Sequence, residues 1–182
     1  MKIALAVGGF KEAVDHEYGF IEDRLKSALF HLGLVVSRKR LTIPVNVLGG
    51  TLNETLKFKN NEPISVLNIS AKIKAIKCFL ETAKKMSPAD LEKAPSIYLV
   101  SIKEGIATKK NILKLKMLPK WLRIRNEITH ASFDKDLNDL KEKCKQAAYD
   151  GKEYCTWVDS FSKQIKRAMA RAKKDIDTSL KG

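Results

Sequence analysis

Apolar residues recur at every third or fourth position in four stretches of this chain, and this periodicity most limits what the chain can fold into. The stretches lie within residues 18–32, 66–80, 137–147 and 158–172. Spacing of three and four places the apolar side chains of a stretch on one face of an α-helix. Each such face has to be buried against a neighbouring element. The pattern therefore predicts an all-α fold, a bundle of about five to seven helices.

Proline and glycine mark where these helices are expected to begin and end. We expect Pro63 to open the second helix and Gly151 to follow the third, because Pro favours a first helical turn and Gly favours the position after the last. A shorter helix is expected to begin after Pro119, and Asp134 is a suitable N-cap for the helix that follows. These signals predict several separate helices, with one break near residue 151.

Residues 34–48 break the helical pattern, because β-branched residues are frequent there and two glycines follow. This composition is typical of a small β-ribbon, and the apolar start of the chain, within residues 1–10, is a suitable partner strand. The chain has no internal repeat and no long linker. We therefore expect residues 1–182 to form a single helical domain with this β appendage near its N-terminus.

Positive charge is concentrated in two blocks. The formal net charge is +14. Residues 101–130 hold eight basic and two acidic residues, residues 163–182 hold seven and two, and residues 131–162 hold five and seven. A solvated helix face explains single runs of lysine, but two blocks that supply nearly the whole imbalance favour a phosphate-rich partner. Nucleic acid is the first candidate and an anionic membrane surface the second.

The composition also predicts a cytoplasmic protein that does not enter a membrane. No stretch has the roughly 18 apolar residues of a membrane span, and the apolar run at the start is shorter than that of a signal peptide. Cys78, Cys144 and Cys155 fit no zinc-binding spacing, and the first two lie at apolar helical positions. We expect reduced cysteines, no metal site and no cofactor.

One of the three histidines lies in a setting suited to acid–base chemistry. His130 follows Arg125 and Asn126, at the end of the first basic block. Histidine is the side chain best able to move a proton near neutral pH. On an ideal helix, Arg123, Asn126 and His130 share one stripe, opposite the apolar residues Trp121, Ile124, Ile128 and Ala131. Arg125 lies about 140° from His130, so the two side chains converge only at a helix end or across a two-fold interface.

The sequence Arg125-Asn126-x3-His130 resembles the R-N-x3-H signature of HEPN domains. This family consists of small helical bundles, many of which are metal-independent endoribonucleases, while others are toxins, antiphage effectors or inactive binding modules. A looser form of the motif, Arg24-x6-His31, also occurs in the chain and illustrates how readily short motifs arise.

The resemblance implies a HEPN-like bundle that forms a homodimer with a composite active site and cuts RNA. The ribose 2′-OH would attack the adjacent phosphate, with His130 as general base or acid. Arg125 would stabilise the charge of the phosphorane, and Asn126 would orient the imidazole or the phosphate. A cognate antitoxin or a defence-system partner is also implied. The basic residues of both blocks are the candidate RNA contacts, namely Lys109, Lys110, Lys114, Lys116, Lys120, Arg123, Arg167 and Arg171.

Two other functions stay open at this point. The same basic blocks suit a non-catalytic helical module that binds RNA or another nucleic acid without cutting it. The heptad-like helix within residues 66–80 suits a protein-interaction bundle that forms oligomers. Trp121 and Trp157 are candidates for base stacking, but each lies near an apolar stripe, which favours packing in the core.

Overall fold

In a computed structural model, residues 9–32, 68–85, 102–130 and 137–179 are described, and they are helical apart from short connections and ends. The four long helices are α2 (Phe10–His31), α4 (Ile69–Lys85), α7 (Lys109–Thr129) and α8 (Leu137–Ser179). One further helical turn spans residues 102–105. These elements confirm the all-α prediction. The predicted ribbon segments 1–10 and 34–48 lie outside the described residues, except that Gly9 and Phe10 begin α2.

Side-chain caps begin two of the helices. The Asn68 side chain accepts a hydrogen bond from the backbone N–H of Ala71, with an N···O distance of 2.8 Å, at the start of α4. Thr108 does the same for Asn111 at the start of α7, at 3.2 Å. Each cap satisfies a backbone donor that has no partner within the helix. The predicted helix starts at Pro63 and Asp134 lie outside the described residues.

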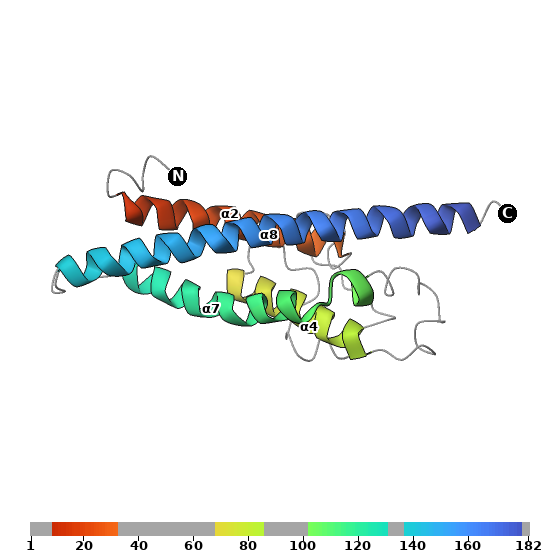
Figure 1. The fold of residues 1–182 in the computed structure, drawn as a ribbon, viewed down its shortest axis with the longest axis horizontal. Helices are drawn as coiled ribbons and strands as arrows, with labels where there is room; N and C mark the ends of the chain where they lie inside the picture. Colours follow the sequence, from red (N-terminus) through yellow and green to blue (C-terminus); the bar gives the residue numbers. More distant parts are fainter. Residues whose placement is uncertain (1–8, 33–67, 86–101, 131–136, 180–182) are drawn as a thin grey trace.

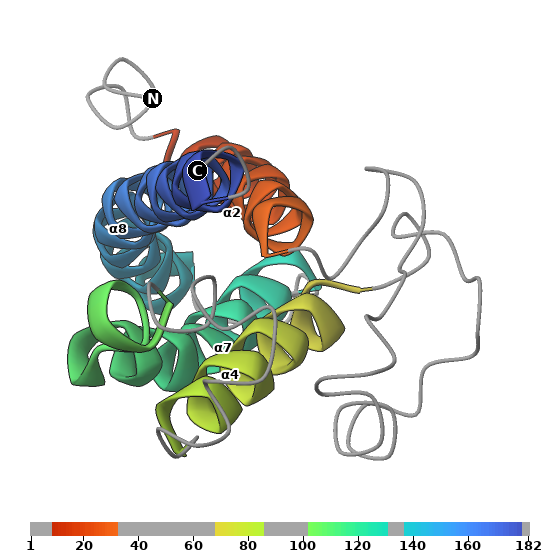
Figure 2. The same ribbon diagram turned by 90° about the vertical axis from the view of Figure 1, so that its right-hand side faces the viewer.

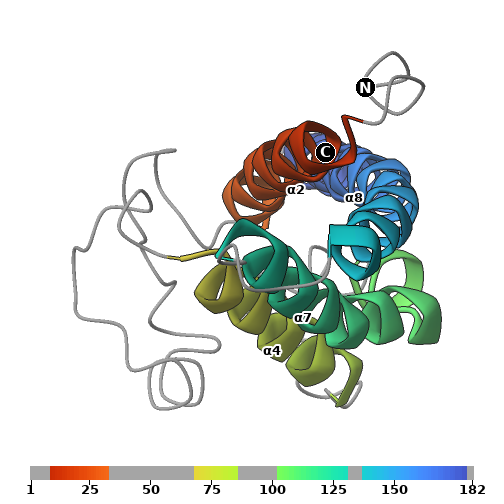
Figure 3. The same cartoon turned by 90° about the vertical axis from the view of Figure 1, so that its left-hand side faces the viewer.

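The four helices form two layers around one core. Helices α2 and α8 lie side by side in one layer, and α4 and α7 form the other (Figures 2 and 3). The chain direction is the same in α2 and α8, whereas α7 runs the opposite way (Figure 1). Buried apolar side chains from all four helices form a single cluster, with Phe79, Phe161, Ile21 and Leu25 among its largest members. This shared core fixes the position of each helix in the described part of the chain.

Helix α8 runs without interruption through Gly151, so the predicted break there is wrong. The helix has 43 residues, which corresponds to a length of about 64 Å. Gly151 is buried, and a Cβ at this position would overlap the Glu17 carboxyl group and lie 2.8 Å from the Trp121 ring. Gly151 therefore lies within the helix because α2 and α7 approach its backbone closely, and it does not act as a cap.

Helix α7 also begins earlier than the sequence signals predict, because Pro119 lies inside it. Proline removes one backbone hydrogen bond from a helix interior. Pro119 is on the exposed side of α7, so its ring takes no space in the core. Leu118 and Trp121, on either side of Pro119, are both buried and keep the helix attached to the core. No helix among the described residues is long and apolar enough to cross a membrane.

Candidate functional site

The Arg-Asn-x3-His motif lies at the C-terminal end of α7. Arg123, Asn126 and His130 are exposed, whereas Trp121 and Ile128 are buried. The prediction of a polar stripe opposite an apolar one is therefore confirmed for the described residues. His130 is the C-cap of the helix, and its backbone N–H donates to the carbonyl of Asn126. The imidazole has no hydrogen-bond or ion-pair partner in the described part of the chain.

The motif is exposed because α4 covers only part of α7. Ile112 and His130 are eighteen residues apart, about five helical turns, so they lie on the same face of α7. Ile112 is buried, whereas His130 is exposed. Figure 1 shows that the C-terminal end of α7 extends past the start of α4, which leaves this end of the face uncovered by α4. The same helix face is therefore core at one end and surface at the other.

Arg125 lies beside this exposed stripe and contacts α2. Its Nη2 lies 3.0 Å from Oδ1 of Asp15, and its guanidinium group lies over the Tyr18 ring at 4.3 Å from the centroid. Nη1 donates to the side-chain oxygen of Asn126 at 3.2 Å. The Arg125 side chain is only 20% exposed. The structure thus joins Arg125 to Asn126 and to α2, and no described contact joins it to His130.

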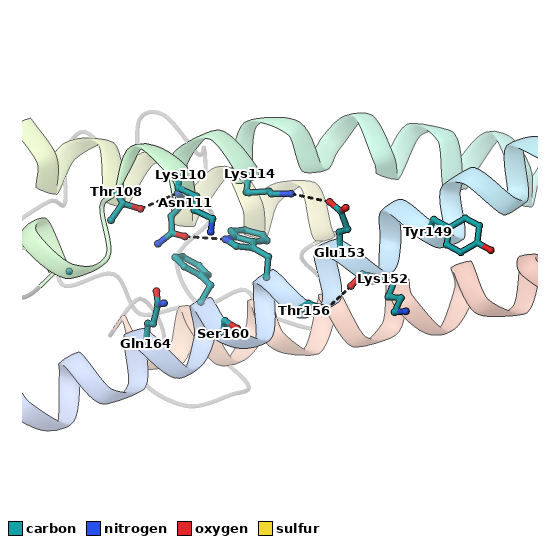
Figure 4. A pocket seen from close by; sticks show the side chains of 13 residues that line it. Thr108, Lys110, Asn111, Lys114, Tyr149, Lys152, Glu153, Thr156, Ser160 and Gln164 are labelled. Carbon is teal, nitrogen blue, oxygen red and sulfur yellow. Dashed lines mark hydrogen bonds and ion pairs between the residues drawn. The ribbon is translucent and has the colours of Figure 1, made fainter. Parts of the chain in front are cut away.

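A second candidate site is a cavity of about 840 Å³ between the start of α7 and the middle of α8 (Figure 4). Its volume is in the range of small-molecule and nucleotide sites. One wall is held rigidly by Asn111, which is 6% exposed. The Asn111 side chain donates to the carbonyl of Ile106 at 2.9 Å and accepts from Nε1 of Trp157 at 3.0 Å. Trp157 in turn stacks on Phe161, with ring centroids 5.2 Å apart.

Positive side chains surround this rigid wall. Lys110, Lys114 and Lys152 line the cavity together with one acidic residue, Glu153. The ammonium group of Lys114 lies 3.5 Å from Glu153 and 5.3 Å from the centroid of the Tyr154 ring. Lys110 and Lys152 are exposed and form no ion pair among the described residues. The cavity therefore presents two uncompensated cations beside an aromatic wall, a combination suited to a phosphate attached to a planar group.

The structure brings only some of the predicted RNA contacts together. Lys110 and Lys114 line the cavity, whereas Lys116 and Arg123 are paired with Glu81 and Glu127, at 3.5 and 3.7 Å. The remaining predicted contacts are exposed, Lys109 and Lys120 on α7 and Arg167 and Arg171 near the end of α8.

Most of the side chains that line the cavity were not predicted from the sequence. Asn111 and Lys152 gave no signal, whereas Tyr149 and Gln164 belong to a polar line with helical spacing that marks one face of α8. Trp157 and Trp121 are 9% and 2% exposed, so the prediction that both pack in the core is confirmed.

No family model matches this chain, and searches of the curated proteins and of the solved structures find no match either. The resemblance to HEPN domains thus depends on Arg125, Asn126 and His130 and on an all-helical fold. Within the described ranges, no group of three or more His, Cys, Asp or Glu side chains is arranged to hold a metal ion.

A buried carboxyl group, which sequence reasoning missed, lies between α2 and α8. Glu17 is 1% exposed, and neither carboxyl oxygen has a hydrogen-bond partner among the described residues. Burial raises the pKa of Glu17 to about 8, although the charge of Lys152 lowers it in part. Burial also raises the pKa of the neighbouring Cys155 thiol to about 12, so this thiol stays neutral and unreactive. The available signal was the spacing of Val14, Glu17 and Ile21, which places Glu17 on the apolar stripe of α2.

Proposed function

We propose that the protein is a metal-independent endoribonuclease of the HEPN type, which acts as a homodimer in a toxin or antiphage system. The observation that carries the proposal is the exposed stripe of Arg123, Asn126 and His130 on the end of α7 that α4 leaves uncovered. The imidazole of His130 is open to a substrate, and basic side chains continue from it along the same helix. A stripe of this kind is suited to a second copy of the chain and to a phosphate backbone.

The proposed reaction is a transesterification within the RNA strand. The ribose 2′-oxygen attacks the adjacent phosphorus. His130 takes up the 2′-OH proton as base or protonates the leaving 5′-oxygen as acid, and solvent water accepts or supplies the other proton. The P–O5′ bond breaks, which leaves a 2′,3′-cyclic phosphate on one fragment and a 5′-OH on the other. Arg125 has five N–H donors, and those not directed to Asp15 and Asn126 would stabilise the phosphorane.

A composite site accounts for the separation of the two principal residues. Arg125 is directed to α2, whereas His130 is directed to solvent, so one copy presents them on different faces. A two-fold axis near the end of α7 would place His130 of one copy next to Arg125 of the other. A cognate antitoxin or another defence protein would then control the activity by covering this end of the bundle.

The second candidate is a helical module that binds RNA without cutting it. One specific observation favours it, namely that Arg125 is held by Asp15 and by the Tyr18 ring and so has a structural role available. The cavity between α7 and α8 would serve this function as well as it serves a nuclease.

An assay on end-labelled RNA in the presence of EDTA separates the two candidates. We expect cutting that resists the chelator and products that end in a 2′,3′-cyclic phosphate. His130→Ala should lower the rate by about 10²–10⁴-fold, the usual contribution of a general acid or base, while RNA affinity stays within about twofold of the original. His16→Ala, which removes an exposed histidine of α2, is the matched control and should cut normally. RNA binding without any cutting supports the second candidate, and full activity of His130→Ala contradicts the first.

A further inference from the structure

The face of α8 that lines the cavity continues as a line of exposed side chains toward the end of the helix. Ser160 and Gln164 line the cavity, and Arg167, Arg171 and Lys174 follow them at spacings of three and four. Residues at this spacing share one helix face, and all five are exposed. We refer to these five residues as the α8 track. The cavity therefore opens at one end onto a basic line of side chains rather than onto neutral surface.

We propose that the cavity and the α8 track together bind single-stranded RNA, with one nucleotide in the cavity and the phosphates that follow it along the track. The inference rests on the proposed function, because it names the form of RNA that the protein takes and where the strand lies. It assigns to the cavity the base and the phosphate on each side of it, and to Arg167 and Arg171 the phosphates beyond.

The composition of the cavity suits an unpaired nucleotide. Figure 4 shows Tyr149 and Gln164 at opposite ends of the cavity. Tyr149 is 49% exposed, so its ring is available to a base at the end away from the track. Stacking on aromatic rings inside a positive groove is the usual way in which proteins hold single strands. A duplex keeps its bases stacked on each other, so a site built around one base favours a single strand.

The charges favour a strand over a free nucleotide. Lys110 and Lys152 lie toward opposite ends of the cavity (Figure 4), so they suit the phosphates on the two sides of one nucleotide. Arg167 and Arg171 lie one and two turns beyond Gln164, where a mononucleotide in the cavity has no atoms for them to contact. The two basic blocks of the sequence meet here, the first through Lys110 and Lys114 and the second through the α8 track.

This site is separate from the proposed catalytic residues. Lys110 and His130 are twenty residues apart on α7, which corresponds to about 30 Å along the helix axis. Binding in the cavity can therefore be measured in a protein that does not cut. It also supplies a contact that holds the substrate at a distance from the bond that is cleaved.

The test follows the two tryptophan indole N–H groups by NMR in the His130→Ala background, so that the RNA stays intact. The Trp157 indole donates to Asn111 in the cavity wall, whereas the Trp121 indole donates to the carbonyl of Ala147 in the core. Single-stranded oligouridine should shift the Trp157 signal and leave the Trp121 signal in place. UMP should shift the same signal but bind more weakly, because it lacks the phosphates that reach the track.

Paired variants test the two halves of the site. Lys110→Ala/Lys152→Ala and Arg167→Ala/Arg171→Ala should each weaken oligouridine binding about tenfold and reduce the slope of log K against log salt by about 1.4, since each phosphate contact on a single strand contributes about 0.7. Lys74→Ala/Lys84→Ala removes the same charge from exposed positions of α4 and is the matched control. Control and test variants that bind equally would overturn the inference.

The remaining outcomes separate this inference from the proposed function. If UMP and oligouridine bind equally well and the arginine pair has no effect, the cavity is a site for a free nucleotide and the strand proposal is wrong. If wild-type protein cuts RNA while the Trp157 signal stays fixed, the RNA lies elsewhere and only this inference fails. If the Trp157 signal shifts but wild-type protein cuts nothing, this inference stands and the proposed nuclease fails.

Discussion

At the scale of single residues, two ionisable side chains give testable predictions, Glu17 on α2 and Arg125 packed against α2. Glu17 is a buried carboxyl group without a hydrogen-bond partner among the described residues, and Arg125 is a guanidinium group with several. A buried carboxylate with no partner is far less stable than its protonated form. Glu17 is therefore mostly neutral at pH 7.

The raised pKa of Glu17 predicts a protein that loses stability as the pH rises. The ordinary value of 4.5 is raised to about 8 in the folded state. Between these two values the folded chain keeps a proton that the unfolded chain loses, so the free energy of unfolding falls across this window, by roughly 4 kcal/mol in total. Glu17→Gln should remove most of this fall in urea denaturation from pH 5 to 8. Glu12→Gln, an exposed control on the same helix, should retain it. Equal pH dependence in Glu17→Gln and wild type would show that the carboxyl group is not protonated.

Arg125 allows its structural and catalytic roles to be measured separately. Arg125→Ala and Asp15→Ala should each lower the free energy of unfolding by about 1 kcal/mol, and the double variant by less than their sum, because the two residues share one partly exposed ion pair. If Arg125 also touches the phosphate, Asp15→Ala keeps RNA cutting and Arg125→Ala loses it. Identical cutting rates in these two variants, measured well below their melting temperatures, would leave Arg125 with a structural role alone.

At the scale of elements, helices were predicted well from their apolar spacing and poorly from their glycine and proline signals. The apolar stripes fall on α2, α4 and α8, as expected. Gly151 and Pro119 were interpreted as ends, because local signals cannot show what packs against a residue from elsewhere in the chain. Gly151 faces a side chain 134 positions earlier, Glu17. The polar stripe of the motif on α7 could be predicted because, like the helices, it follows from the spacing of residues within one segment. The cavity could not be predicted, because residues from three separate elements line it.

Replacing Gly151 by alanine is predicted to lower the stability of the protein, which is the opposite of the usual effect inside a helix. Replacing an interior helical glycine by alanine ordinarily stabilises a helix by about 1 kcal/mol. Here the added methyl group would overlap Glu17 and press on the Trp121 ring, so Gly151→Ala should destabilise the protein by about 1–3 kcal/mol. Gly19→Ala is the matched control, because nothing lies within 4 Å of its Cβ position, and it should be neutral or stabilising. The thermal unfolding of both variants measures this difference. A Gly151→Ala protein more stable than wild type would mean that α2 and α8 leave room for a methyl group at this position.

At the scale of the whole molecule, the two candidate sites lie at opposite ends of α7. One end of α7 carries the Arg-Asn-x3-His motif, and the other contributes to the cavity that leads to the α8 track. The acidic surplus of residues 131–162 separates the two basic blocks in sequence. In the fold these blocks meet along the α7–α8 contact. Their positive charge is therefore clustered on one part of the surface and is not spread evenly over it.

A composite site between two copies predicts that two inactive variants rescue each other. Purified Arg125→Ala and His130→Ala are each expected to be inactive. In a mixed dimer, one of the two sites combines the intact Arg125 of one chain with the intact His130 of the other. Random exchange of subunits should therefore restore about a quarter of the wild-type activity per chain. When an Arg125→Ala/His130→Ala double variant exchanges with an equal amount of wild type, no mixed dimer has an intact site, so the activity of the mixture should fall by about half. Failure of the two single variants to rescue each other after proven exchange would place both residues of a site in one chain.

The unbroken α8 has a consequence for how this part of the chain can change in length. Among the α8 residues whose burial the structure describes, Ile165 is the last fully buried one, and Arg167 and Arg171 follow it on the same unbroken helix. Each residue inserted between them and the core would turn their angular phase by 100°, so a single insertion carries both arginines to another side of the molecule. Seven inserted residues restore the phase to within about 20° while moving the arginines about 10 Å outward. Substitutions along this segment change one contact at a time, but insertions and deletions preserve the surface only in steps of about two helical turns.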